Sequence, residues 1–373
     1  MSNTTTVTER TVTPRSLGRL VKKAFKKKIP LMIWGPPGVG KSDIIWQVGK
    51  EQGRPVIDIR LLLMDPTDLK GIPYYNPETK KMHWGQPSDL PDPSEPDQGA
   101  IIFLDEINAA PPSVQAAAYQ LILNRRIGTY HLPENSVLVA AGNRQSDKGV
   151  AYKMPTPLAN RFTHCTLTVD SDDWNKWAIK NYIHSDVVGF LSSSEQDLFQ
   201  FDPKSSSPAF PTPRTWARVS MLIDDDDDDT GNDDLTENEL VDMVIGTVGE
   251  AAGVKFAAYR RQTSLLPKPG DILRGFVREL EDNSRVDIQY ALSTNLCYSL
   301  DKELKLAREK GDLSEWYGMA NTFIKFITTN FKEELIVLSA RMAIKQFDLP
   351  FHPTKVSLWA DFSERHQDLI LEA

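Results

Sequence analysis

The chain has 373 residues and a net charge of −8, with 40% hydrophobic and 25% charged residues. This length is too great for one ordinary core, and the composition is that of a globular protein, so two or three domains are expected. The acidic balance argues against a global nucleic-acid surface, two cysteines argue against a disulfide framework, and the lack of a membrane-spanning or signal-peptide run favours the cytoplasm.

Short apolar runs alternate with helical patterns from residue 14 to residue 170, which is typical of a parallel sheet flanked by helices. Residues 1–13 are rich in Ser, Thr and Asn, and a disordered tail is expected there. The predicted strands are Leu31–Trp34, Val56–Leu61, Ala100–Leu104, Val137–Ala141 and Thr163–Val169, and the predicted helices are Ser16–Lys27, Ser42–Gly53, Pro112–Asn124 and Ser171–Ile183.

The stretch 65–98 interrupts this rhythm with many prolines and two arms of alternating side chains. The arms, Tyr74-Tyr75 and Met82-His83-Trp84, flank a turn, so we predict a β-hairpin inserted into the sheet domain. Aromatic side chains on such arms usually pack together, here Tyr75 against Trp84. The alternative is that exposed members grip a partner, and the candidates are Tyr74, Tyr75, Lys80, Lys81, His83 and Trp84.

Six consecutive aspartates, Asp224–Asp229, open an acidic segment that extends to Asp234. A run of like charges without fixed spacing is usually solvated, so an acidic loop over 224–234 is favoured over a metal site. Beyond this loop the chain is expected to be all helical, because apolar residues recur at helical spacing. The clearest stretches are Glu237–Tyr259, Val277–Leu280, Ile288–Leu300 and Phe323–Phe347.

Residues 35–42 match the P-loop pattern G-x-x-x-x-G-K-[ST] at every fixed position. An apolar strand precedes the loop and a helix follows it, so backbone N–H groups and a helix N-terminus would hold phosphates. Lys41 would reach the β- and γ-phosphates, and the Ser42 hydroxyl would bind Mg²⁺. The motif predicts a site for ATP with Mg²⁺ that is formed by Gly35, Pro36, Pro37, Gly38, Val39, Gly40, Lys41 and Ser42.

Further polar residues stand at the ends of later apolar runs. Asp105 ends a buried strand and suits a magnesium ligand, and Glu106 directly after it is placed to polarise an attacking water. Asn143 ends the next strand, where its amide would bond the γ-phosphate or that water. Arg161 would stabilise transition-state charge as an arginine finger supplied by a neighbouring subunit. Arg214, at a predicted helix start beyond the sheet domain, would reach the nucleotide from a lid.

In this order the motifs resemble those of AAA+ ATPases of the MoxR branch, the group that includes the RavA-type and CbbQ/NorQ-type ATPases. Leu61–Gly71 resembles the segment that leads into the helix-two insert of this family, and Asn124–Pro133 resembles its pre-sensor hairpin. The resemblance covers about residues 14–260, and no part of the family matches the chain after about residue 265. The corresponding parts are Walker A (35–42), Walker B (101–106), the sensor-one Asn143, the finger Arg161 and the sensor-two Arg214.

The resemblance implies an α/β P-loop NTPase domain over 14–210 with the hairpin inserted at about 65–98, a helical lid over 211–265, and a further helical region over 266–373. It also implies a homo-oligomeric ring, usually a hexamer, in which Arg161 completes the site of the next subunit. The implied function is Mg²⁺-dependent ATP hydrolysis coupled to remodelling of a protein partner, in this family usually one with a von Willebrand factor A domain.

Other functions remain open on sequence alone. A nucleic-acid-associated motor is supported by a lysine-rich helix over 16–28, although a solvated helix face is the more usual interpretation and the net charge of −8 opposes the motor. A nucleotide-gated scaffold, or a small-molecule kinase, would leave Glu106 and Arg161 without a role. The lysines of the lysine-rich helix are Lys22, Lys23, Lys26, Lys27 and Lys28.

Overall fold

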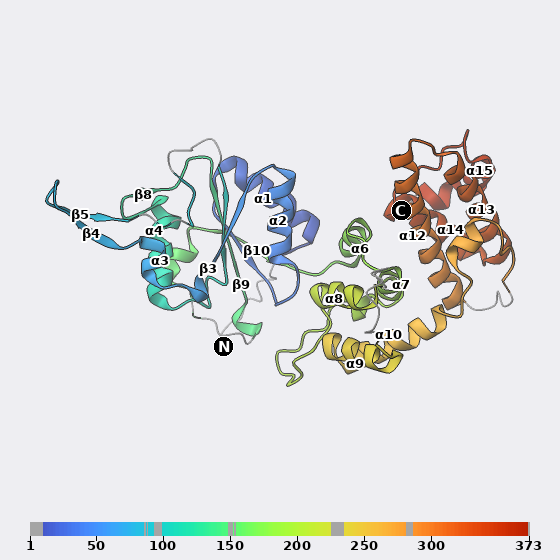
Figure 1. Cartoon of the computed structure of the whole chain (residues 1–373), viewed down its shortest axis with the longest axis horizontal. Helices are drawn as coiled ribbons and strands as arrows, with labels where there is room; N and C mark the ends of the chain where they lie inside the picture. The colour runs from blue at the N-terminus through green and yellow to red at the C-terminus, as the bar shows by residue number, and fades with distance from the viewer. Residues whose placement is uncertain are drawn as a thin grey trace, which may run out of the picture. The chain divides into compact units, whose positions relative to one another are not determined.

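The computed structural model describes residues 10–85, 87, 89–92, 99–147, 152, 154–224, 235–280 and 286–371. The chain divides into two compact units, the first made of residues 1–170 and 201–205 and the second of residues 171–200 and 206–373 (Figure 1). Among the described residues, all strands belong to the first unit, and the second unit is helical.

A six-stranded sheet forms the centre of the first unit, in the order β1-β10-β2-β9-β6-β3. All its neighbouring strands are parallel. The predicted α/β fold is therefore confirmed, and each predicted strand is present within about two residues of its expected limits. The strands are β1 (Thr11–Val12), β2 (Leu31–Trp34), β3 (Val56–Arg60), β6 (Ile101–Asp105), β9 (Val137–Gly142) and β10 (Thr163–Leu167).

Helices cover both faces of this sheet, with α1 and α2 on one side and α4 on the other (Figure 1). Met32, Ile102 and Leu138 join the buried cluster that α4 contributes to. Because both faces are covered, the central strands are apolar along their length, as the sequence predicted. The helices of this unit are α1 (Pro14–Lys27), α2 (Lys41–Glu51), α3 (Pro66–Lys70), α4 (Pro112–Asn124) and α5 (Thr156–Ala159).

The N-terminal segment corrects one prediction. Thr11 and Val12, expected within a disordered tail, form β1 and pair in parallel with Thr166 and Leu167 of β10. Polar composition suggested the tail, but β-branched residues fit a strand wherever a sheet edge is open to them. Residues 1–9 lie outside the described part of the chain.

The predicted inserted hairpin is confirmed as β4 (Pro73–Asn76) and β5 (Lys81–Trp84), and it projects away from the sheet (Figure 1). The Asn76 side chain closes its turn by accepting the N–H groups of Glu78 and Thr79 at 2.9 and 3.3 Å. Residues 86, 88 and 93–98 of the loop that follows lie outside the described part.

Tyr75 and Trp84 are not directly opposite each other in this hairpin, and their packing across it stays a prediction. In the observed register Tyr75 lies opposite Met82, and Trp84 lies opposite Pro73. Trp84 packs on Gly128, where an added Cβ would lie 3.8 Å from the indole Cγ. Gly128 is at the turn of a second hairpin, formed by β7 (Arg126–Ile127) and β8 (Tyr130–His131), so Trp84 joins the two hairpins.

The second unit is built around two groups of aromatic side chains. Phe190, Trp216 and Phe256 contact one another, and a separate stack contains Trp316, Phe351 and Trp359. The helices are α6 (Ser171–Lys180), α7 (Ser185–Ser193), α8 (Pro213–Ile223), α9 (Glu237–Val248), α10 (Glu250–Thr263), α11 (Pro269–Leu273), α12 (Val286–Lys310), α13 (Ser314–Asn330), α14 (Glu333–Arg341) with a π-helical turn over Met342–Gln346, and α15 (Ser357–Leu371).

Three helix predictions in this unit need correction. The stretch Phe323–Phe347 is not one helix, because α13 ends at Asn330 and α14 begins at Glu333. The stretch Glu237–Tyr259 is broken at Gly249, whose φ of 86° ends α9 and begins α10. Val277–Leu280 is not helical. The Asn330 side chain accepts the N–H of Leu280 at 2.8 Å and donates to the carbonyl of Arg278 at 3.0 Å, so this backbone is satisfied without a helix.

The limits of the compact units differ from those of the predicted domains, because α6 and α7 group with the later helices rather than with the sheet. The division into an ATPase domain (14–210), a lid (211–265) and a C-terminal region (266–373) stays a prediction. Residues 225–234 of the expected acidic loop lie outside the described part. No helix in the described ranges is both long enough and apolar enough to cross a bilayer.

Candidate nucleotide site

The P-loop joins β2 to α2 at the carboxyl edge of the sheet. Gly38 and Gly40 have φ angles of 78° and 87°, in the left-handed region that favours glycine. Val39 between them is 4% exposed and anchors the loop in the core. Helix α2 begins at Lys41, so the N–H groups of its first turn open onto the loop, as phosphate binding at a helix N-terminus requires.

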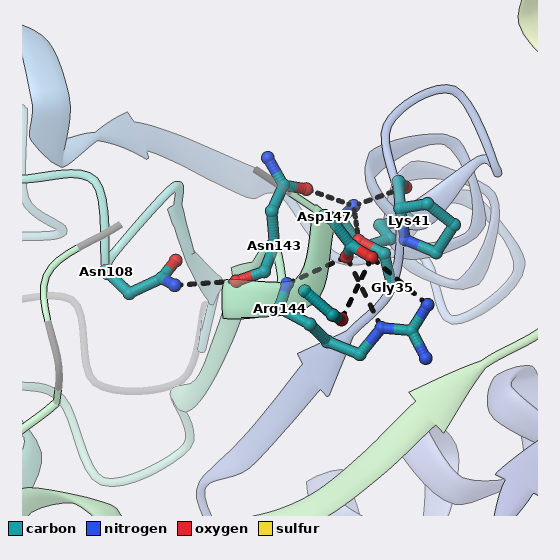
Figure 2. Close-up of polar contacts among 8 residues, drawn as sticks. Gly35, Lys41, Asn108, Asn143, Arg144 and Asp147 are labelled. Atoms are coloured by element: carbon teal, nitrogen blue, oxygen red, sulfur yellow. Dashed lines mark hydrogen bonds and ion pairs between the residues drawn. The ribbon is translucent and has the colours of Figure 1, made fainter. Parts of the chain in front are cut away.

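The Lys41 ammonium lies between the P-loop and the tip of β9 (Figure 2). Its Nζ donates to the carbonyl oxygens of Gly35 at 2.7 Å and Pro36 at 2.9 Å, and to Asn143 Oδ1 at 3.0 Å. An ammonium carries only three N–H donors, so a bound phosphate would compete with these protein oxygens. The structure therefore brings together two residues, Lys41 and Asn143, that the sequence had assigned to one site.

Ser42 and Asp105 meet on the other side of the loop. Ser42 Oγ donates to Asp105 Oδ2 at 3.2 Å. A hydroxyl and a carboxylate oxygen are ligands that suit Mg²⁺, which also keeps waters and phosphate oxygens in its shell. The pair therefore fits that ion. In the described ranges, this site included, no group of three or more His, Cys, Asp and Glu side chains could hold a metal.

Glu106 follows Asp105 in an unusual backbone conformation. Its φ of 53° lies in the left-handed region, which costs a residue with a side chain about 1–3 kcal/mol. Its N–H donates to Asp105 Oδ1 at 2.9 Å, so the Walker B aspartate holds the turn as well as facing Ser42. The half-buried Glu106 is thus placed at the tip of β6.

Sequence reasoning missed a buried residue of this turn, Asn108. It is 4% exposed, and its Nδ2 donates to the backbone oxygen of Asn143 at 2.7 Å (Figure 2). The only sequence signal for Asn108 was its position shortly after Glu106, in a turn where polar residues are common.

An ion pair in the loop after Asn143 was also missed. Asp147, with a side chain 3% exposed, accepts the Arg144 N–H at 2.9 Å, Nε at 3.3 Å and a terminal guanidinium nitrogen at 3.2 Å (Figure 2). Several charge-assisted bonds to one buried carboxylate fix the path of this loop. The spacing of three residues between opposite charges was the available signal.

Arg161 is exposed in the turn between α5 and β10, and its role as a finger stays a prediction. The ring of His164 connects this turn to the P-loop strand. His164 Nδ1 accepts from the Trp34 indole at 2.9 Å, so Nε2 carries the proton and donates to the Ala159 carbonyl at 2.8 Å. His164 was not among the predicted site residues.

Arg214 belongs to the second unit, where it is exposed in the first turn of α8. Its part in the site stays a prediction.

Two of the lysines on the lysine-rich helix form ion pairs within the first unit, Lys22 with Glu51 at 2.6 Å and Lys28 with Glu134 at 3.4 Å. These pairs weaken the case for a nucleic-acid surface there.

A hollow of about 690 Å³ lies beside the site, at the base of the β4–β5 hairpin. Asp58 of β3 lies at its edge, and Asp58 Oδ1 is buried with no hydrogen-bond partner among the described residues. Burial, and secondly the charge of Asp105, raise the pKa of the Asp58 carboxyl above its ordinary value. The other lining residues are Arg60, Leu63, Met64, Thr67, Asp68, Gly71, Ile72, Gly85, Pro87 and Asp89.

Residues 30–162 match the family model of the AAA domain, dynein-related subfamily. Midasin of Giardia intestinalis is 24% identical over 189 residues, which are 48% of this chain and 4% of that protein. The chain thus spans a small fraction of the length of this relative.

Similar solved structures include a putative ATPase from Cytophaga hutchinsonii, at 13% identity and a TM-score of 0.33 over 88% of this chain and 79% of that one. The RuvB Holliday junction branch migration motor of Thermotoga maritima gives 14% identity and a TM-score of 0.36, over 70% of this chain and 74% of that one. NtrX from Brucella abortus in complex with ATP gives 12% identity and a TM-score of 0.37, over 81% of this chain and 68% of that one.

The match of the family model covers the sheet from β2 to the turn before β10, and it includes the P-loop, both carboxylates, Asn143 and Arg161. Together with the parallel sheet and its strand order, it gives residues 30–162 the fold of an AAA+ P-loop ATPase.

Proposed function

We propose that the chain is a Mg²⁺-dependent ATPase of the MoxR type, which assembles into a ring and uses ATP hydrolysis to remodel a protein partner. The observation that carries this proposal is the meeting of three segments at one sheet edge. Lys41 bonds Asn143 at 3.0 Å, Ser42 bonds Asp105 at 3.2 Å, and Glu106 follows in a strained turn. Nucleotide binding alone would not need Glu106 or Asn143.

In this proposal Lys41 and the loop N–H groups bind the β- and γ-phosphates. Ser42 and Asp105 would hold Mg²⁺, which neutralises charge on the phosphate oxygens. Glu106 takes a proton from the attacking water, and the Asn143 amide orients that water. Both side chains project from neighbouring strands, since β6 pairs with β9 in the sheet.

Arg161 supports a ring, because an exposed arginine beside the last strand suits a site completed by a neighbour. We propose a hexamer, in which Arg161 of one subunit faces the nucleotide of the next. Arg214 would couple the position of the helical lid to the γ-phosphate.

The β4–β5 hairpin is the proposed contact with the protein partner, which in MoxR-type systems is a von Willebrand factor A domain protein. Tyr74, Tyr75 and Met82 are 51%, 59% and 60% exposed, which is unusual for side chains of this size. Trp84 is half-buried against Gly128 and is better explained as the anchor of the hairpin. The exposed side chains are therefore available to a partner.

The proposal is tested with Glu106→Gln, which removes the base but leaves the phosphate contacts. We expect ATP to bind with unchanged affinity and hydrolysis to fall by about 10²–10⁴-fold, the usual contribution of a general base. Phosphate release and fluorescent-nucleotide binding measure the two effects. The matched control is Glu134→Gln, which alters a carboxylate 90% exposed in the same unit.

Hydrolysis at the wild-type rate by the Glu106→Gln protein would refute the role of Glu106. The same variant, held with ATP, also serves to capture what the ring acts on. Recovery of nucleic acid alone would contradict a protein partner, and recovery of a protein that is lost when Tyr75 and Met82 are both changed to Ala would support it.

A further inference from the structure

The turn between β6 and α4 contains a buried amide that the proposed mechanism does not use. Asn108 points from this turn toward the tip of β9 (Figure 2). Its Nδ2 donates to the Asn143 backbone oxygen at 2.7 Å, and it is 4% exposed. The orientation of the amide is fixed, because a carbonyl oxygen accepts and cannot donate.

The other polar atom of the Asn108 amide, Oδ1, lies close to Gly142 of β9. A Cβ added to Gly142 would collide with Asn108 Oδ1 and would lie 2.9 Å from Met32 Cε. Gly142 therefore has no room for a side chain, and its glycine allows Asn108 to approach the strand. This close packing adds a steric constraint to the hydrogen bond.

Backbone hydrogen bonds fasten the same turn to β9 and to Tyr152. The Ile107 N–H donates to the Ala141 carbonyl at 3.1 Å, and the Asn108 carbonyl accepts the Tyr152 N–H at 2.6 Å. Glu106, directly before these residues, has a strained φ of 53°. Strained residues persist only where their surroundings hold them, and Asn108 lies two residues after Glu106 in the same turn.

We propose that Asn108 is a positioning residue that fixes Glu106 relative to Asn143. This inference rests on the proposed function, in which both side chains act on one water. Asn108 itself touches no reacting atom, because its side chain is satisfied by the backbone of β9. A misplacement of about 1 Å at such a site can cost on the order of 10² in rate.

The test compares two isosteric changes of a buried amide to a carboxyl. Asn108→Asp removes the donor to Asn143. Gln115→Glu is the control, since Gln115 is 3% exposed and its Nε2 donates to the Ala110 carbonyl at 2.9 Å, away from β9. Both variants should lower the melting temperature. Only Asn108→Asp should lower kcat, by about 10–100-fold, with KM for ATP and nucleotide affinity within about two-fold of wild type.

A second variant disturbs the contact between Asn108 and β9 from the side of the strand. Gly142→Ala leaves the amide intact but drives it away, so kcat should fall as in Asn108→Asp. Hydrogen exchange of the Ile107 N–H should be faster in both variants and unchanged in Gln115→Glu. These readouts are available from Gly142→Ala if Asn108→Asp does not fold.

The wild type and Glu106→Gln are assayed alongside. If the wild type hydrolyses ATP, Glu106→Gln does not, and Asn108→Asp keeps a kcat equal to that of Gln115→Glu, the positioning role is wrong and the proposed function stands. If the wild type does not hydrolyse ATP, the proposed function fails and the positioning role fails with it.

Discussion

Glu106 has a left-handed backbone, and the groups around it stabilise that conformation. Its own N–H bonds the Asp105 carboxylate at 2.9 Å, and its carbonyl accepts the Ala109 N–H at 2.8 Å. A strained residue whose neighbours satisfy its backbone is a frequent feature of catalytic sites. The backbone of Glu106, from which its carboxylate projects, is therefore fixed before any nucleotide arrives.

Asp58 allows a prediction about pH. Its folded-state pKa is raised, mainly by burial, so the folded protein binds the proton more tightly than the unfolded chain does. Stability should therefore fall as pH rises from the ordinary carboxyl pKa of 3.8 through the raised value. An uncharged amide mimics the protonated carboxyl, so Asp58→Asn should raise the melting temperature at pH 7, and the gain should shrink toward pH 4.

The measurement is thermal unfolding between pH 4 and pH 7 without Mg²⁺, with Glu134→Gln as the exposed control. An Asp58→Asn protein that is less stable than wild type at pH 7 would show that the ion pair of Asp58 Oδ2 with Arg60 Nε, at 3.7 Å, outweighs the cost of burial.

At the scale of elements, apolar runs and turn residues predicted the strands and the inserted hairpin well, because buried parallel strands need continuous apolar sequence. The errors arose where tertiary contacts override local pattern. Gly249 breaks a continuous helical pattern because its φ of 86° is not helical, and an added Cβ there would lie 2.9 Å from the Ala209 carbonyl. Asn330 bonds a backbone that looked helical.

The residues of the candidate site also divide into those that local sequence predicts and those that only the fold brings together. Residues in fixed motifs, such as Lys41 and Asp105, were found because their chemistry dictates their spacing. Asn108 and His164 were not found, because each forms a hydrogen bond with a residue that only the fold brings near. Asn108 bonds Asn143 at the end of β9, and His164 bonds Trp34 of β2.

Two glycines of the second unit give opposite predictions for one substitution. Gly318 in α13 has nothing within 4 Å of an added Cβ, so Gly318→Ala should stabilise the unit by about 0.5–1 kcal/mol through helix propensity. Gly253 in α10 faces Ile245, whose Cα would lie 2.8 Å from the new Cβ, so Gly253→Ala should destabilise by about 1–3 kcal/mol.

Thermal unfolding distinguishes the two glycine variants, since ~1 kcal/mol shifts the midpoint of a unit of this size by about 2–4 °C. Equal shifts in one direction would mean that the close approach of α9 to α10 is absent in solution.

At the scale of the whole molecule, a ring makes each proposed active site a shared property of two chains. In the proposed ring the P-loop and both carboxylates would come from one subunit and Arg161 from the next, so a heterologous interface would repeat around the assembly. A defect in either half should then be repaired by mixing subunits, which no monomeric enzyme allows.

This arrangement predicts complementation between Lys41→Ala and Arg161→Ala. Each alone should be nearly inactive, and loss of an arginine finger costs about 10³–10⁵-fold. In an equal mixture that assembles at random, about a quarter of the interfaces combine an intact Lys41 with an intact Arg161. Steady-state hydrolysis should recover to a comparable fraction of the wild-type rate.

The control replaces the Lys41→Ala protein with a variant that carries both Lys41→Ala and Arg161→Ala, and so cannot supply Arg161 to a neighbour. Arg161→Ala mixed with it should stay inactive. Activity in this control, or no recovery in the first mixture, would contradict a finger supplied by a neighbour.

The strand order of the sheet also has a consequence for how the chain is made. The central strand β2 pairs with β9, where Leu31 lies beside Val139, and with β10, where Leu31 lies beside Thr163. During synthesis both edges of this apolar strand therefore wait for segments made much later. Non-local parallel pairing is slow, and open apolar edges invite association between unfinished chains. The P-loop strand is thus synthesised well before both of the strands that flank it. The interval before they pair with it is the stage at which this sheet is most open to aggregation.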